Sequence, residues 1–226
     1  MHLNSKIDFS KFAFIFDHDG VLADNEKLHK QAWFKVLEMN SLNISDKEYI
    51  KEVKGFSTKD AVGNLFPELS SNQQERIRSE KAMTYDGMVK KSLKPISGVI
   101  GFVKASKKIG IKTCIASAAL RKRIDFSIVK FGLENDIDKI LSSEDVAKTK
   151  PDPEVYLKAI KYLNVNPENA FIFEDSPNGL IAANLSGANA IFVNSSNLKE
   201  NEVNQKYLFE IKNFDNLDPE FFINKR

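Results

Sequence analysis

Two aspartates stand two residues apart directly after an apolar segment near the start of the chain. Asp17 and Asp19 follow the run Phe12–Phe16, and Gly20 comes immediately after them. Side chains two residues apart in extended backbone point the same way, so the two carboxylates would converge. Convergent carboxylates can attack an electrophile, transfer protons or bind a cation. The plainer alternative is that both aspartates only end a strand and begin a turn.

Polar side chains that could take part in chemistry also follow three later apolar segments. They are Ser117 after residues 111–116, Lys148 and Lys150 beyond residues 139–142, and Glu174 and Asp175 after residues 170–173. Four carboxylates in one crevice would repel one another and raise one another's pKa, unless cations offset them. One lysine offsets too little charge, so the set predicts a hard divalent cation, Mg²⁺, held by carboxylates and by the phosphate of a substrate.

Phosphoryl transfer suits this set, because it needs positioning and charge neutralisation more than covalent machinery. Asp17 would attack phosphorus and form an aspartyl phosphate. Asp19 would protonate the leaving oxygen and later take a proton from the acceptor. Ser117 would donate a hydrogen bond to a phosphoryl oxygen, and Lys150 would offset charge in the transition state.

The elements that position these residues alternate regularly from Pro95 onward. Predicted strands at residues 12–16, 111–117, 139–142, 170–173 and 190–193 are separated by helices at residues 97–109, 120–131, 152–163 and 176–186, with a short strand at 207–211 and a last helical turn at 219–223. Ser97 is expected to cap its helix. Such alternation predicts an α/β fold with a doubly wound, Rossmann-like parallel sheet. Parallel sheets bind ligands at the carboxyl ends of their strands, where the polar residues lie.

The segment after the first strand reads as helical throughout. Helices are expected at residues 25–39, 46–53, 58–65 and 72–91, with no strand between them. We therefore expect a core domain of residues 1–24 and 95–226 and a small helical domain of residues 25–94, with hinges near Asp24 and Lys94.

Composition limits the class of protein. The 226 residues are 42% hydrophobic, and the net charge is +2, which does not resemble a nucleic-acid or membrane footprint. Cys114 lies in an apolar run and indicates a buried thiol in a reducing compartment. The first eleven residues lack a signal-peptide core, and no stretch reaches the ~18 apolar residues of a membrane span. We expect a cytoplasmic monomer that binds a small phosphorylated metabolite.

Four segments resemble the four motifs of the haloacid dehalogenase (HAD) superfamily. They are residues 17–24, Ser117 after Cys-Ile-Ala, Lys150 within Lys-Thr-Lys-Pro-Asp-Pro, and residues 173–176 with Gly179. The resemblance implies a subclass I helical cap domain and the branch that holds β-phosphoglucomutase and small sugar-phosphate phosphatases. It implies that Mg²⁺ is held by Asp17, by the backbone carbonyl of Asp19 and by the acids Glu174 and Asp175.

The resemblance extends to substrate contacts in the helical domain. His29 matches a cap histidine near the hinge, while Gly55, Ser57 and Lys59 match the substrate-specificity loop. Gly20 and Ala118 would complete the substrate site. The mutase has an arginine where this chain has Thr58, and lysine is a poorer bidentate clamp than arginine. Ser117 followed by Ala118, in contrast, resembles the mutase, where many phosphatases have Thr-Asn.

Three further residues are expected to have structural roles only or to lie in solvent. His18 should point away from Asp17 and Asp19 in the pleat and serve packing. Lys81 could supply a second phosphate contact, but a solvated helix lysine is the favoured interpretation, and Trp33 should lie in the core of the helical domain.

The leading hypothesis is a Mg²⁺-dependent phosphatase that acts on a small phosphomonoester, a sugar phosphate, through an aspartyl phosphate at Asp17. The alternatives are a β-phosphoglucomutase-type phosphomutase with the same chemistry and a non-catalytic binding protein that kept the fold. Dehalogenase and phosphonatase readings are disfavoured, because those branches lack the second aspartate and this chain has Asp19.

Overall fold

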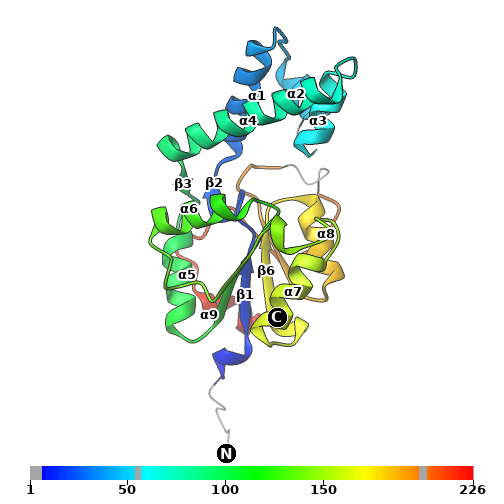
Figure 1. Ribbon diagram of the computed structural model, residues 1–226. Coiled ribbons are helices and arrows are strands. Elements are labelled where there is room, and N and C mark those ends of the chain that lie inside the picture. The colour runs from blue at the N-terminus through cyan, green and yellow to red at the C-terminus, as the bar shows by residue number, and fades with distance from the viewer. Residues whose placement is uncertain (1–6, 54–56, 199–202, 226) are drawn as a thin grey trace, which may run out of the picture. The chain divides into compact units, whose positions relative to one another are not determined.

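The chain consists of two compact units in the computed structural model, which describes residues 7–53, 57–198 and 203–225. One unit comprises Met1–Asp24 and Lys94–Arg226, and the other comprises Asn25–Leu93. The first unit is an α/β domain, and the second is helical (Figure 1).

A six-stranded sheet forms the centre of the α/β unit. Its strands are β1 (Ala13–Phe16), β4 (Lys112–Ala116), β5 (Lys139–Leu141), β6 (Ala170–Glu174), β7 (Asn189–Val193) and β8 (Phe209–Ile211). The strand order is β5-β4-β1-β6-β7-β8, and each neighbouring pair is parallel. The predicted parallel α/β fold is therefore confirmed. Two short strands, β2 (Ala23–Asp24) and β3 (Lys94–Pro95), pair antiparallel where the chain leaves the unit and returns to it.

Helices cover both faces of this sheet. They are α5 (Val99–Lys108), α6 (Arg121–Phe131), α7 (Glu154–Leu163), α8 (Pro177–Leu185) and α9 (Pro219–Asn224), with 3₁₀ turns at Phe9–Lys11, Ser143–Asp145 and Pro167–Asn169. Figure 1 shows α5 and α9 on one side of the sheet and α7 and α8 on the other.

The two central strands share the sequence Ala-Phe-Ile-Phe and pair in register, with Phe14 beside Phe171 and Phe16 beside Phe173. Because successive side chains alternate between faces, all four phenylalanines point to one side. There they meet Phe102 of α5 and Phe222 of α9, with Phe16 and Phe173 stacked at 4.9 Å. The alanines and isoleucines point to the other side, where they pack against Val155, Ala159 and Leu180 of α7 and α8. A slip of one residue would put bulky rings into the space of alanines, so the register is strongly specified.

The start of α5 differs from the sequence-based prediction. The N-cap is Gly98, with φ of +78°, and the Ser97 hydroxyl instead donates to Asp215 Oδ1 at 2.8 Å. A Cβ at position 98 would lie 2.4 Å from the backbone carbon of Phe214. Close packing of the C-terminal segment against this turn therefore requires glycine, and the expected serine cap at Ser97 is wrong.

The helical unit contains α1 (Glu26–Met39), α2 (Asp46–Glu52), α3 (Thr58–Leu65) and α4 (Ser71–Ser92). Residues from all four helices form its core, among them Trp33, Tyr49, Val62 and Ile77. The interpretation of Trp33 as a core residue is thus confirmed.

Helix α4 buries one residue in every four: Ile77, Lys81, Tyr85 and Val89. The interpretation of Lys81 as a solvated lysine is wrong, since this side chain is 5% exposed. It lies on the buried stripe because residues four apart share one face of a helix.

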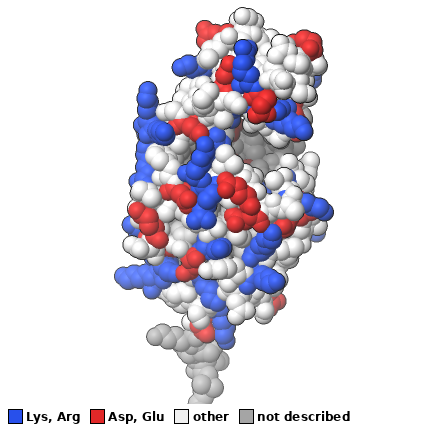
Figure 2. Space-filling model, in the orientation of Figure 1, with Lys and Arg blue, Asp and Glu red and all other residues white. Residues whose placement is uncertain are grey.

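Charges of both signs are interleaved over the visible face of the molecule (Figure 2), in keeping with the net charge of +2. Over the part of the chain that the structure describes, no helix combines the length and the hydropathy needed to cross a membrane.

Candidate active site at the carboxyl ends of the strands

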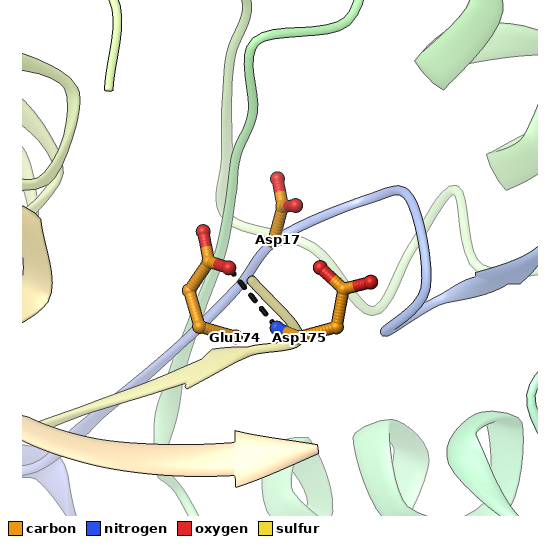
Figure 3. Close-up of side chains that lie close together, drawn as sticks. All are labelled: Asp17, Glu174 and Asp175. Atoms are coloured by element: carbon orange, nitrogen blue, oxygen red, sulfur yellow. Dashed lines mark hydrogen bonds between the residues drawn. The ribbon is translucent and has the colours of Figure 1, made fainter. Parts of the chain in front are cut away.

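Three carboxylates gather where β1 and β6 end. Asp17 follows β1, while Glu174 and Asp175 lie at the end of β6, and one oxygen from each lies within 4.8 Å of the others. The backbone holds this arrangement, because the amide of Asp17 donates to the carbonyl of Phe173 at 3.0 Å. Figure 3 shows the three side chains side by side at the ends of these strands. The sheet thus brings together acids that are far apart in the sequence.

Lys150 is the cation that this cluster contains. Its Nζ lies 2.9 Å from Asp17 Oδ1 and 2.5 Å from Glu174 Oε1, and its side chain is 8% exposed. Burial opposes its charge, but the carboxylates of Asp17 and Glu174 outweigh burial and raise the pKa of Lys150. Lys148, the other lysine of this segment, is 75% exposed and pairs with Asp152 at 3.7 Å. Of these two lysines, the structure therefore brings Lys150 to the acids.

Glu174 accepts five hydrogen bonds. Its Oε1 accepts from Lys150 Nζ and from the Tyr156 hydroxyl, each at 2.5 Å. Its Oε2 accepts from the amides of Asp175 and Ser176 at 3.0 and 3.2 Å and from the Ser176 hydroxyl at 3.1 Å. A carboxylate offers about four lone-pair sites, so Glu174 has little capacity left for a further ligand. Asp17 and Asp175 are the carboxylates with capacity to spare.

Two glycines make room for the acids. A Cβ at Gly179 would lie 1.9 to 2.1 Å from the carboxyl atoms of Glu174. A Cβ at Gly20 would lie 2.0 Å from Asp175 Oδ2, and the φ of Gly20 is +72°. The sequence indicated a turn or a close approach at Gly20, and the structure has both.

Burial makes the remaining two carboxylates costly to ionise. Burial chiefly, opposed by Lys150 and reinforced by Glu174 and Asp19, raises the pKa of Asp17 to about 6. Burial, with Glu174 and Asp17, raises the pKa of Asp175 well above its usual value. Asp17 Oδ1 is also buried without a hydrogen bond, although it faces Lys150.

Three carboxylates and one ammonium leave an excess of negative charge in a site whose spare ligand atoms are carboxylate oxygens. Raised carboxyl pKa values, and a buried Asp17 Oδ1 whose partner is the ion pair with Lys150, are what a hard divalent cation would relieve. The residues present therefore fit Mg²⁺.

Asp19 lies in a tight loop after Asp17, and its side chain is 41% exposed. The loop closes on the carbonyl of His18, which accepts from the amides of Leu22 and Ala23 at 3.0 and 2.9 Å. The His18 ring is buried and lies 2.7 Å from Asp19 Oδ1. The interpretation of His18 as a packing residue that points away from Asp19 is wrong.

Ser117 follows β4, the other parallel neighbour of β1. Its side chain is 2% exposed, and its hydroxyl accepts from the amide of Ala119 at 3.1 Å. That acceptance leaves the hydroxyl proton available for donation. Ala118, beside it, is exposed.

The predicted substrate residues of the helical unit have separate environments. Ser57 caps α3 by accepting from the amide of Asp60 at 3.1 Å, and Lys59 is exposed. His29 stacks on Tyr85 at 3.9 Å, and its Nδ1 lies 3.0 Å from Lys81 Nζ. Gly55 lies outside the described residues.

Comparison with known proteins gives a consistent result. The profile of the haloacid dehalogenase-like hydrolases matches residues 14–193. The phosphorylated carbohydrates phosphatase of Thermotoga maritima is 29% identical over 185 residues, covering 80% of this chain and 83% of the relative. A HAD hydrolase of family IA, variant 3, from Entamoeba histolytica superposes with a TM-score of 0.83 at 28% identity, covering 94% of this chain and 98% of the other. The β-phosphoglucomutase of Clostridium difficile superposes with a TM-score of 0.75 at 26% identity, covering 94% and 96%.

Proposed function

Because the chain belongs to the haloacid dehalogenase-like hydrolases, we propose that it is a Mg²⁺-dependent phosphatase of small phosphomonoesters that works through an aspartyl phosphate at Asp17. The observation that carries this proposal is the cluster of Asp17, Glu174 and Asp175, in which Lys150 pairs with the buried Asp17 and Glu174. A phosphate monoester is the substrate class that such a site would take once a divalent cation offsets its charge.

In the first half of the reaction, a carboxylate oxygen of Asp17 attacks phosphorus and the bond from phosphorus to the leaving oxygen breaks. Asp19 gives its proton to that oxygen, so the product leaves as an alcohol. Lys150 and the Ser117 hydroxyl stabilise the charge on the transferring phosphoryl oxygens. The product of this half is an acyl phosphate on Asp17.

In the second half, a water molecule gives a proton to the Asp19 carboxylate and attacks phosphorus. The bond from phosphorus to the Asp17 oxygen breaks, which releases inorganic phosphate and restores both carboxyl groups. Asp19 is thus the acid of one half-reaction and the base of the other.

Asp17, Asp175 and the backbone carbonyl of Asp19 would hold the Mg²⁺, with Glu174 holding Lys150 in place through its hydrogen bonds. When bound, the cation supplies charge neutralisation for the phosphoryl group and for the two acids. Glu174 was also predicted as a ligand, and its five donors make it the weakest of the candidates.

The helical unit of Asn25–Leu93 would act as the cap that selects the substrate. The named activity of the Thermotoga maritima relative, a phosphatase of phosphorylated carbohydrates, favours a sugar phosphate. His29, Ser57 and Lys59 remain the proposed contacts with the sugar.

The test is Mg²⁺-dependent phosphate release from a panel of hexose, pentose and alditol monophosphates, with nucleoside monophosphates as a comparison class. Release from a few related sugar phosphates, abolished by EDTA and by Asp17→Asn, is expected. An Asp17→Asn variant that keeps wild-type turnover would exclude the aspartyl phosphate.

A phosphomutase is the second candidate. Ser117 followed by Ala118 resembles the mutase motif, and β-phosphoglucomutase of Clostridium difficile has the same fold. Conversion of β-glucose 1-phosphate to glucose 6-phosphate with a trace of the bisphosphate, and with little free phosphate, would favour it. Thr58, at the position of the phosphate-gripping arginine, counts against it.

A further inference from the structure

His18 connects Asp19 to a helix more than a hundred residues away. Its ring is 3% exposed, with Nδ1 2.7 Å from Asp19 Oδ1 and Nε2 2.7 Å from the hydroxyl of Ser127 in α6. Ser127 is 1% exposed, and its hydroxyl also lies 3.0 Å from the carbonyl oxygen of Arg123 one turn earlier. Ser127 of α6 thus contacts the ring at Nε2, and the ring reaches Asp19 at Nδ1.

The direction of these hydrogen bonds follows from the chemistry of the groups. An ionised carboxylate can only accept, so Nδ1 of a neutral His18 ring must carry the proton and donate it to Oδ1. Nε2 is then an acceptor, and it takes the single proton of the Ser127 hydroxyl, so that this proton is not donated to the carbonyl of Arg123 at the same time. Both ring nitrogens are therefore satisfied in a buried position, where an unmade hydrogen bond would be costly.

We propose that His18 is a positioning residue for Asp19, and that Ser127 fixes His18 in this role. The ring occupies Oδ1 and sets the rotation of the carboxyl group, so that the proton exchanged with the substrate is carried on Oδ2. Without the ring, either oxygen could take the proton, and the carboxyl group could rotate away from the leaving oxygen. This inference rests on the proposed function, because it assigns His18 to the acid–base half of that chemistry.

The geometry makes this role separable from loop structure. The loop after Asp17 closes through the backbone carbonyl of His18, which accepts from Leu22 and Ala23. These bonds belong to the main chain and persist when the side chain changes. His18→Leu removes the ring donor while filling similar volume. His18→Asn keeps an N–H donor near the position of Nδ1, and Ser127→Ala removes only the distant anchor.

The experiment compares kcat/KM for two substrates in the Mg²⁺-loaded enzyme. Departure of a sugar alkoxide needs a proton from Asp19, whereas p-nitrophenolate is a stable anion and needs little help. General acid catalysis contributes roughly 10²–10⁴-fold. We expect His18→Leu to lower kcat/KM for a hexose phosphate by roughly ten- to a hundredfold and that for p-nitrophenyl phosphate by less than about threefold. Ser127→Ala should give a weaker loss with the same bias, and His18→Asn should restore most of the hexose phosphate activity.

A second readout does not depend on turnover. The chain has three histidines, so ¹⁵N-histidine labelling gives a simple spectrum in which the His18 tautomer can be read. We expect a ring proton on Nδ1 whose signal shifts in the Asp19→Asn variant and disappears in His18→Leu.

The outcomes separate the two proposals. Equal losses for both substrates in His18→Leu and Ser127→Ala, or no loss in folded variants, would overturn the role of His18 and leave the phosphatase intact. A ring proton on Nε2 in the Mg²⁺-loaded enzyme would do the same. A wild-type enzyme that releases phosphate from neither substrate would instead overturn the proposed function, and the role of His18 with it.

Discussion

Replacement of Asp17 by asparagine should stabilise the metal-free protein. Burial raises the pKa of Asp17 from 3.8 to about 6, so the folded state opposes its ionisation despite the nearby Lys150. A shift of about 2.2 units at 1.36 kcal/mol each corresponds to about 3 kcal/mol at a pH above 6. For a chain of this size that is an increase in Tm of roughly 6–12 °C. Asparagine resembles the neutral acid and avoids most of this cost.

The pH dependence has a definite sign. Between pH 3.8 and about 6 the folded state holds a proton on Asp17 that the unfolded state has lost. The unfolding free energy due to this group therefore falls as pH rises through that window and is constant above it. The stability difference between Asp17→Asn and wild type should accordingly be full at pH 8, about half as large at pH 5 and absent below about pH 4.

The assay is thermal or urea unfolding of both proteins in EDTA at several pH values. Asp24→Asn is the matched control, since Asp24 belongs to the same segment and is exposed, and it should change Tm little. Mg²⁺ at 1,000 times its Kd should reverse the order, because the cation then stabilises wild type by about 4.1 kcal/mol, which exceeds the advantage of about 3 kcal/mol, and the variant would bind it weakly. A variant that melts at or below wild type in EDTA at pH 8 would refute the argument, because the ion pair with Lys150 would then outweigh the burial of the carboxylate.

Three further predictions concern the same site. Tyr156→Phe keeps the ring beside Lys150 but removes the hydroxyl that donates to Glu174, so kcat should fall roughly three- to tenfold with little change in Tm. The control Tyr162→Phe, on the surface, should have no effect, and an unchanged kcat in Tyr156→Phe would show that Glu174 does not need this donor. Gly20→Ala places a Cβ 2.0 Å from Asp175 Oδ2 at a φ of +72°, so Mg²⁺-dependent turnover should drop more than about 100-fold. The control Gly63→Ala should retain turnover, because a Cβ at position 63 would meet no atom within 4 Å. Protons compete with Mg²⁺ for Asp17 and Asp175, because the pKa values of both carboxyl groups are raised, so the Mg²⁺ affinity measured by calorimetry should fall as the pH is lowered through 6. A constant affinity from pH 8 to 5 would exclude these two residues as ligands.

The sequence was most informative where a residue's role depends on its neighbours in the chain. The apolar runs before Asp17, Ser117 and Glu174 were recognisable as buried strands, because each is short, continuous and bounded by polar residues. Parallel pairing then implied that their carboxyl ends meet. The predicted family and the predicted hydrolase class of enzyme are confirmed by the profile match over residues 14–193.

Contacts between distant segments were not predictable. Tyr156 reaches Glu174 of β6 from helix α7, and no local pattern distinguishes it from an ordinary core tyrosine. His18 was misassigned because strand alternation was extended too far. Strand β1 ends at Phe16, and the turn that follows brings His18 toward Asp19.

The prediction for Lys81 was wrong for a different reason. Ile77, Tyr85 and Val89 lie on one face of α4 at intervals of four residues, and a lysine interrupts that stripe. The charge of Lys81 indicated a solvent-exposed side chain, whereas its position on the apolar face of the helix indicated a buried one. The rings of Trp33 and Tyr85, 5.5 and 5.0 Å from its Nζ, accommodate the cation in the buried position.

The order in which the strands are made has a consequence for synthesis on the ribosome. Strand β1 emerges first, yet its partners β4 and β6 lie about 100 and 155 residues later, as the pairing of Phe14 with Thr113 and Phe171 requires. Until then its Ala-Phe-Ile-Phe segment has an unpaired edge that is apolar on both faces. Strand β6 has the same sequence and later pairs with this edge of β1. On a polysome the edge of β1 in one nascent chain is therefore open to the matching strand of a neighbouring copy. Crowded translation is therefore the stage at which this protein is most exposed to strand exchange between copies.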